Sequence, residues 1–379
     1  MSETSIHSRE SYTEEVDRVD EQQWNRVLEK FDDANLMQTW SYASARWGQG
    51  HLSHVVLREN SEIVAAAQVV THTMPFLGAS VSRLRGGPVW QLRNRESDPQ
   101  ILRQMLRALR RIFVNHGGLL LEIFPTGDAD RTGAIRPLFE EEGFAFDLSG
   151  GVQLTALIDL SHSLEDLRRS LRPTWRRNLV LAERNTFTIQ QGSSDELFDA
   201  VGKLYVEGLR RRRLTAVVSL SQLKKIQKNL PESQKMKVML CEYQGEPVSG
   251  IAVPCLGDTA QAFLSGTADK GLNLRGSYLL QWRMLKWLKE SGYRWYDLDG
   301  HSQDLNSGDT QFKLGFAGRF GLQKERFGRF ETSNEGVSLA FVRAGLRIRK
   351  AYTGMRVAFS SGVPQAFRKL PPAQSARKQ

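Results

Sequence analysis

The sequence of 379 residues contains only two cysteines, Cys241 and Cys255, and no cluster of Cys and His at the spacing of metal ligands. It therefore has no disulfide framework and gives no indication of a zinc site. No apolar run is long enough to span a bilayer, and the first residues lack the hydrophobic segment of a secretory signal. We expect a soluble cytoplasmic protein in which both cysteines are small packing residues.

Acidic residues are absent after Glu335, where nine Lys and Arg residues follow. The formal net charge of the whole chain is +10, so residues 1–335 carry only about +1. The basic character thus belongs to a C-terminal segment, in which we expect a helix from Val337 to about Val357. Such a basic amphipathic helix suits an anionic membrane surface at the inner face of the plasma membrane, or tRNA phosphates. Alternatively, it docks on the rest of the chain with its arginines exposed.

The length predicts two domains, and the order of expected elements repeats. Val55 and Val238, Glu122 and Asp297, and Gly143 and Gly315 occupy matching places, with offsets of 183, 175 and 172 residues. Such similar offsets favour two copies of one α/β module, although two unrelated α/β domains could give the same pattern. The expected boundaries are residues 1–20 for a disordered start, 21–149 and 150–332 for the modules with a linker at 149–151, and 333–379 for the basic helix and tail.

Apolar periodicity and turn residues predict the elements of both copies. In the first copy we expect helices at 21–31, 39–47, 99–115 and 136–142, a hairpin at 54–58 and 63–70, and strands at 81–84 and 119–124. In the second copy we expect strands at 153–160, 186–190, 237–242, 248–253, 262–265 and 293–298, and helices at 164–171, 173–185, 195–213, 219–229 and 276–291, with a short one ending at Gly315.

The stretch from Leu264 to Gly318 organises the second copy as a β-α-β unit. Its central helix is predicted by apolar residues at three- to four-residue spacing from Tyr278 to Leu288. Arg275 and Gly276 lie at the first turn of this helix, where unpaired N–H groups favour an anion. Glycine lets a ligand approach the backbone, and arginine suits phosphate. The alternative is a plain junction between a loop and a helix.

Three segments together resemble a known family. They are RPTWRRN from Arg172, GSYLLQWRMLKWLKESGYRWYDLDG from Gly276, and QFKLGF from Gln311. Their order resembles the GCN5-related N-acetyltransferase (GNAT) fold, in the tandem arrangement of the FemABX-type peptidyltransferases and their BioF2-like acetyltransferase relatives. The resemblance implies an α/β (α+β) fold of two GNAT-like modules, each a mixed, mostly antiparallel sheet flanked by helices.

The resemblance also implies transfer of an acyl or aminoacyl group to an amine. The donor would be aminoacyl-tRNA or acyl-CoA, with no permanently bound cofactor and no metal. The acceptor would be a nucleotide- or lipid-linked precursor of the cell envelope. By the family pattern, the lysine of Phe-Lys-x-Gly-Phe, here Lys313, supports the reaction centre.

Amide formation needs a proton acceptor and a positive or N–H-rich partner for the developing oxyanion. Lys313 can supply positive charge, although a solvated surface lysine is the alternative, because the first copy has Glu141 at the matching place. Asp297, Asp299 and His301 are the candidates for accepting or relaying the proton; for the aspartates, loop capping is the alternative.

Further residues are candidates for binding substrate or phosphate. Arginine pairs bidentately with phosphate oxygens, and aromatic rings stack on bases or sugars, but solvated helix faces and core packing are the competing interpretations. The set comprises Arg275, Gly276, Ser277, Tyr278, Phe312, Arg176, Arg177, Trp175 and Arg211.

These observations support three hypotheses. The first is an N-acyl or aminoacyl transferase that forms an amide on a peptidoglycan or polysaccharide precursor. The second is an acyl-CoA-dependent N-acetyltransferase of surface polysaccharide or lipid assembly. The third is a non-catalytic protein that docks on membrane or RNA through residues 336–379.

Overall fold

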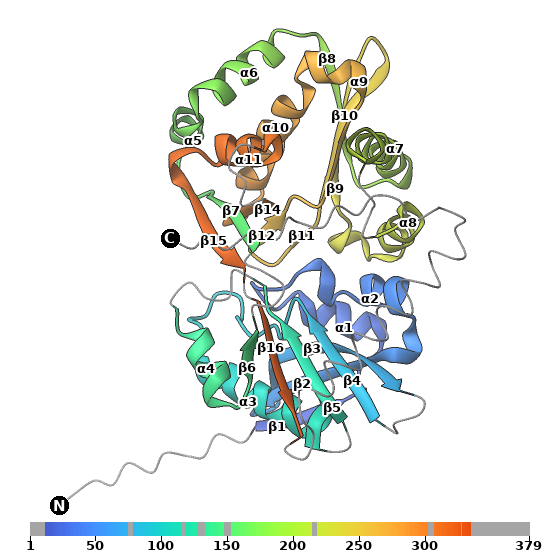
Figure 1. The fold of residues 1–379 in the computed structure, drawn as a ribbon, viewed down its shortest axis with the longest axis vertical. Helices are drawn as coiled ribbons and strands as arrows, with labels where there is room; N and C mark the ends of the chain where they lie inside the picture. The colour runs from blue at the N-terminus through green and yellow to red at the C-terminus, as the bar shows by residue number, and fades with distance from the viewer. Residues whose placement is uncertain are drawn as a thin grey trace, which may run out of the picture. The chain divides into compact units, whose positions relative to one another are not determined.

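The computed structural model describes residues 12–74, 79–115, 118–126, 133–147, 153–213, 218–301, 307–326 and 328–334 (Figure 1). We call residues 12–147 module 1 and residues 153–326 module 2. Both consist of mixed, mostly antiparallel sheets flanked by helices, as predicted. The predicted linker at 149–151 and the predicted basic helix of residues 336–379 lie outside the described residues.

Module 1 is built on a sheet with strand order β1-β2-β3-β4-β5-β16-β6. The predicted hairpin is β2 and β3, which pair antiparallel with Val56 opposite Ala66. Asn60 and Ser61 at its turn have positive φ angles of 47° and 73°, which match the right-handed twist of hairpin strands. The strands are β1 (Tyr12–Val16), β2 (Leu52–Glu59), β3 (Glu62–Met74), β4 (Ala79–Arg85), β5 (Gly118–Phe124), β6 (Ala145–Asp147) and β16 (Arg329–Ser333).

Side-chain caps fix where the helices of module 1 begin. The Asp98 side chain accepts a hydrogen bond from the N–H of Gln100 and so starts the helix at Pro99, as predicted. Asp20 and Gln23 form a reciprocal capping box at the first helix. The helices are α1 (Glu21–Leu28), α2 (Trp40–Trp47), α3 (Pro99–Arg110), which continues as a π-helical turn at Arg111–Asn115, and α4 (Ile135–Glu141).

The prediction of a disordered start is wrong for residues 12–20. Residues 12–16 form β1, which pairs antiparallel with β2 from Tyr12 opposite Glu59 to Val16 opposite Val55. The acidic composition of this segment hid the strand, because only Tyr12 and Val16 pack against the core. Pairing with β2 supplies the backbone hydrogen bonds that a short polar segment cannot form alone.

One strand returns to module 1 after module 2 is complete. β16 follows module 2 in sequence, yet it lies in the sheet of module 1 between β5 and β6. Phe330 of this strand is fully buried and stacks on Phe139 at 4.1 Å between ring centroids. Residues 329–332, which the expected boundary at 332 assigns to the second module, therefore complete the first.

Module 2 contains a sheet of order β13-β10-β9-β8 and a sheet of order β11-β12-β14-β7-β15. Its strands are β7 (Gln153–Asp159), β8 (Phe187–Gly192), β9 (Lys237–Tyr243), β10 (Glu246–Val253), β11 (Cys255–Leu256), β12 (Thr259–Gln261), β13 (Leu264–Thr267), β14 (Trp295–His301) and β15 (Gly321–Arg326). Its helices are α5 (Leu164–Ser170), α6 (Pro173–Glu183), α7 (Asp195–Arg212), α8 (Leu220–Asn229), α9 (Asp269–Leu274), α10 (Gly276–Glu290) and α11 (Gly308–Ala317).

Helices cover both faces of the β13-β10-β9-β8 sheet (Figure 1). Side chains of a strand alternate between faces, and those of β9 divide accordingly between cores. Val238 and Leu240 pack with α7 and α8, whereas Met239 and Cys241 pack with α6 and α10. Cys241 is thus a buried packing residue, as predicted.

The two sheets of module 2 diverge within one stretch of chain. β12 pairs in parallel with β14, with Gln261 opposite Asp297, and the N–H of Ala262 still donates to the carbonyl of Asp297. After Phe263 the chain continues as β13, which pairs instead with β10. The predicted strand at 262–265 is therefore shifted to Leu264–Thr267. This divergence places the carboxyl end of β14 beside a sheet edge.

A buried histidine in module 1 makes stability depend on pH. His54 is 3% exposed, and its ring stacks on Trp40 at 4.1 Å. Burial lowers the pKa of His54 from 6.5 to about 4, against smaller opposing contributions from Gln68 and Asp17. The folded state therefore favours the neutral ring.

We predict that this histidine weakens the fold in mild acid. As the pH falls from 6.5 towards 4, the unfolded chain takes up a proton at His54, whereas the folded chain keeps the ring neutral. The free energy of unfolding therefore decreases over this range, by about 3 kcal/mol in total. Urea unfolding of wild type and His54→Phe at about pH 7, 5.5 and 4.5 measures this decrease. The other titrating groups are the same in both proteins, so their effects cancel in the difference between the two free energies of unfolding. A difference between the two proteins that stays constant over this range contradicts the prediction.

Candidate active site

Aromatic side chains join three helices of module 2. Trp175 of α6 lies 5.0 Å from Tyr278 of α10, and Tyr278 lies 5.0 Å from Phe312 of α11, measured between ring centroids. Trp175 and Phe312 are 5.8 Å apart. Rings at these separations attract one another beyond the effect of burial. The three segments whose sequences carry the resemblance thus meet in one aromatic cluster.

Trp175 packs within this cluster, which favours the core interpretation over stacking on a ligand. It is 3% exposed and stacks on Phe316 at 4.5 Å. A Cβ atom on Gly315 would lie 3.1 Å from the indole ring, which explains the glycine in the Phe-Lys-x-Gly-Phe motif. Tyr278 and Phe312 are half-buried.

The turn before α10 is held by hydrogen bonds within the protein. Arg275 adopts a left-handed backbone conformation with φ of 61°. Its Nε donates to Oδ1 of Asn178 on α6 at 2.8 Å, and an Nη donates to the carbonyl of Asn273 at 2.7 Å. Arg275 therefore connects α10 to α6, in addition to placing a positive charge at the first turn.

Gly276 has a packing role in the structure. It is buried, and an added Cβ atom would lie 3.3 Å from Cβ of Ser249 and 3.4 Å from Sγ of Cys241. The glycine therefore allows α10 to pack closely on β9 and β10. Ser277, beside it, is half-buried.

The carboxyl end of β14 contains a β-bulge. Pairing with β7 shifts register between Asp297 and Gly300, and Asp299 has a positive φ of 64°. Oδ1 of Asp297 accepts hydrogen bonds from the hydroxyl of Thr155 and from the N–H of Asp299, so this carboxylate fixes the bulge. The bulge therefore interrupts the regular alternation of side chains along β14 between Asp297 and Gly300. Bulges of this kind are common beside active sites.

Asp299 lies where the two sheets diverge. Its Oδ1 accepts a hydrogen bond from Nε2 of Gln261 at 3.1 Å, and Gln261 is the last residue of β12. The half-buried carboxylate is therefore held at the junction between the strand that pairs with β14 and the strand that leaves it.

Lys313 connects α11 to the same bulge. Its Nζ donates to the carbonyl of Gly300 at 2.7 Å and lies 3.3 Å from a carboxylate oxygen of Asp309, one turn earlier on α11. The lysine side chain is 19% exposed. An ammonium group has three donors, so a donor remains for a further acceptor at this position.

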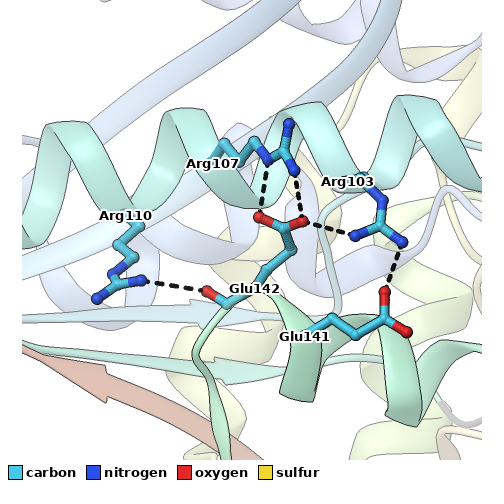
Figure 2. Close-up of polar contacts among 5 residues, drawn as sticks. All are labelled: Arg103, Arg107, Arg110, Glu141 and Glu142. Atoms are coloured by element: carbon cyan, nitrogen blue, oxygen red, sulfur yellow. Dashed lines mark hydrogen bonds and ion pairs between the residues drawn. The ribbon is translucent and has the colours of Figure 1, made fainter.

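The matching position of module 1 has a different structural role. Glu141 of α4 forms an ion pair with Arg103 of α3 at 2.7 Å, and Glu142 accepts hydrogen bonds from Arg103 and Arg107 (Figure 2). The hydrogen bond with Arg107 is the main cause that lowers the pKa of Glu142. These ion pairs fasten α4 to α3, which is consistent with reaction chemistry in module 2 only.

The remaining predicted residues either have side chains that are not part of the aromatic cluster or have side chains outside the described residues. Arg176 and Arg177 are exposed on α6. Arg211 of α7 donates to the carbonyl of Thr267 and to the carboxylate of Asp269, so it secures the start of α9. The backbone of His301 ends β14, but its side chain lies outside the described residues.

The sequence did not single out several residues that organise the site, namely Thr155, Asn178, Gln261 and Gly300. Asn178 is part of the RPTWRRN segment, so its presence there was the available signal. The others act through long-range pairing, which no local pattern reveals.

In the described part of the chain no cluster of acidic, His and Cys side chains could hold a metal ion. Likewise, no described helix has both the length and the apolarity needed to cross a bilayer.

Comparison with known proteins agrees with the predicted resemblance. Residues 217–343 match the sequence profile of the FemAB family. This range includes α10, the β14 bulge and the Phe-Lys-x-Gly-Phe motif. A sequence search of curated proteins returns no match.

Solved structures share the fold over most of the chain. FemX superposes with a TM-score of 0.69 at 15% identity, covering 84% of this chain and 96% of FemX. The C-terminal domain of a putative lysylphosphatidylglycerol synthetase from Agrobacterium fabrum gives a TM-score of 0.51 at 14% identity, covering 86% and 95%. A conserved protein of unknown function from Bacteroides thetaiotaomicron gives 0.53 at 9% identity, covering 84% and 99%.

Proposed function

We propose that this chain, which belongs to the FemABX-type family, is an acyl or aminoacyl transferase that forms an amide on an amine of a cell-envelope precursor. The observation that carries the proposal is the meeting of Lys313, Gly300 and Asp299 at the carboxyl end of β14. Fold alone does not define an activity, so the activity has to follow from the chemistry of these groups.

The reaction requires an uncharged amine to attack an ester or thioester carbonyl. A C–N bond forms, the C–O or C–S bond to the donor breaks, and one proton passes from the amine to the leaving group. Lys313 supplies positive charge to the oxygen on which negative charge develops, from a position fixed by the Gly300 carbonyl. Asp299 is the group best placed to relay the proton, because its carboxylate is held at the divergence of the sheets.

The point where the two sheets of module 2 diverge also supports a binding site for the acyl donor. β13 pairs with β10 on one side and forms the edge of its sheet among the described strands. An exposed strand edge offers backbone N–H and C=O groups to an extended chain that contains amides. An acyl-CoA donor has such an arm, so this edge favours the acyl-CoA-dependent N-acetyltransferase as the second candidate. The family match favours aminoacyl-tRNA.

Thermal unfolding in the presence of each donor separates the two candidates. A ligand that binds only the folded state at 100 times its Kd stabilises by about 2.7 kcal/mol, which raises the melting temperature measurably. If the donor is acyl-CoA, we expect CoA to protect the protein and tRNA to leave the midpoint unchanged. If the donor is aminoacyl-tRNA, we expect the reverse, with protection by a charged tRNA carrying a stable amide linkage. Protection by neither donor contradicts the proposed function.

A further inference from the structure

A cavity of about 320 Å³ lies beside α10, and none of its lining residues belongs to the aromatic cluster. Four residues of α10, which follow one another at helical spacing, form one of its walls, and α5, the end of α6 and the start of β8 form the rest. A volume of this size lies in the range of small-molecule sites. The lining residues are Arg168, Glu183, Asn185, Phe187, Ile189, Leu279, Trp282, Arg283 and Lys286. We call this cavity the α10 pocket.

Positive charge exceeds negative charge in the α10 pocket. Its lining holds three cationic side chains and one carboxylate, that of Glu183, for a net charge of +2. Arg168 satisfies this carboxylate with two parallel hydrogen bonds of 2.8 and 2.6 Å. The pairing with Arg168 is the main cause that lowers the pKa of Glu183, and the charges of Arg283 and Lys286 lower it further.

Arg283 and Lys286 are thus the cations available to a ligand. They lie three residues apart on α10, so both project from the same side of the helix. Among the residues that the structure describes, neither forms a hydrogen bond or a close ion pair with a carboxylate. Arg283 is exposed and Lys286 is half-buried, so both can reach a bound anion without breaking an existing contact.

Apart from Asn185, whose amide donates to the carbonyls of Leu181 and Leu274, the rest of the lining is apolar and aromatic. Trp282 is 5% exposed, and the guanidinium of Arg168 lies 5.6 Å from the centre of its ring, so this side of the pocket is already packed. Phe187 and Ile189 of β8 are half-buried and leave apolar surface beside the two free cations. A fitting ligand therefore combines an anionic group with a flat or apolar group.

We propose that the α10 pocket binds a phosphate ester, with the phosphate between Arg283 and Lys286 and its organic group against Phe187 and Ile189. Phosphate suits this arrangement because arginine pairs bidentately with its oxygens, while lysine adds a point charge. The organic group comes from a nucleotide or from a phospholipid. The site is separate from Lys313 and does not depend on the proposed transfer reaction.

Calorimetric titration of the full-length protein with three probes tests the site: inorganic pyrophosphate, adenosine diphosphate, and a short-chain phosphatidic acid below its micellar concentration. We expect pyrophosphate to bind and at least one organic phosphate to bind more tightly. Preference for the diphosphate identifies a nucleotide source, and preference for the phosphatidic acid identifies a lipid source. Failure of all three probes to bind overturns the proposal, whatever the outcome of transfer assays.

Two double variants locate the binding. Arg283→Glu with Lys286→Glu should weaken every probe at least tenfold. Lys225→Glu with Lys228→Glu is the matched control, because these exposed lysines of α8 have the same spacing and undergo the same change of charge. Phe187→Ala should weaken the organic phosphates but leave pyrophosphate binding unchanged. Equal losses in both double variants would show attraction by net charge alone and would overturn the pocket assignment.

Discussion

Replacing Lys313 by alanine is expected to lower turnover by about 10²- to 10³-fold, the loss typical of removing one donor to a developing oxyanion. The folded state should survive, because the contacts of this half-buried side chain are a backbone carbonyl and a neighbouring aspartate. Steady-state transfer rates and thermal midpoints of wild type and Lys313→Ala provide the measurement. The fall should appear in kcat, since the interaction strengthens in the transition state.

Lys324→Ala provides the control for this prediction. Lys324 of β15 is also a half-buried lysine of module 2, and it makes no hydrogen bond or ion pair in the described part of the chain. It should keep wild-type turnover. Full activity in Lys313→Ala would show that Lys313 takes no part in the reaction. Its role would then be limited to connecting α11 to the bulge.

Arg329→Ala should destabilise the fold by about 3–5 kcal/mol, the cost of breaking a buried ion pair by removing one of its partners. Arg329 lies on β16, the strand that returns to module 1, and pairs with Glu122 of β5 and Asp147 of β6. Glu122 is 1% exposed, and Glu331, which lies 3.3 Å from Arg329, is fully buried. Burial would lower the pKa of Arg329, but these three carboxylates raise it overall. Arg329 thus contacts all three carboxylates across the sheet, whereas Arg83 of β4 pairs with Glu122.

Urea unfolding of Arg329→Ala and Arg95→Ala compares a buried arginine with an exposed one. Arg95 makes a forked ion pair with Glu62, but the two side chains are 55% and 47% exposed. Exposed pairs contribute at most about 1 kcal/mol, so Arg95→Ala should shift the unfolding midpoint only slightly. Equal shifts of the unfolding midpoint in the two variants would show that the ion pairs of Arg329 do not hold β16 in the sheet of module 1.

The local patterns of the sequence predicted the helices and the fold better than they predicted contacts between distant segments. Apolar spacing gave the helix at Gly276–Glu290, and the Asp98 cap gave the start of the helix at Pro99. The order of the motifs gave the tandem fold, which the FemX superposition supports. These features depend on residues close together in the chain, and such patterns report local structure directly.

Features that depend on long-range pairing were missed. β16 has no local mark of membership in the first sheet, because its partners lie about 180 residues earlier in the sequence. The bulge at Asp299 cannot be read from an alternating pattern. The packing role of Gly276 was missed because its close neighbours, Ser249 and Cys241, belong to a hairpin that is distant in the sequence. In each case the deciding contact is tertiary.

The most direct test of the transferase proposal is mass spectrometry of an amine-bearing envelope precursor incubated with the purified protein, charged tRNA and acyl-CoA together. The proposal predicts a precursor whose mass has increased by one acyl or aminoacyl group through an amide bond. It also predicts that Lys313→Ala forms far less of this product over the same time. An unmodified precursor with both donors present, under conditions in which the protein is folded, would contradict it.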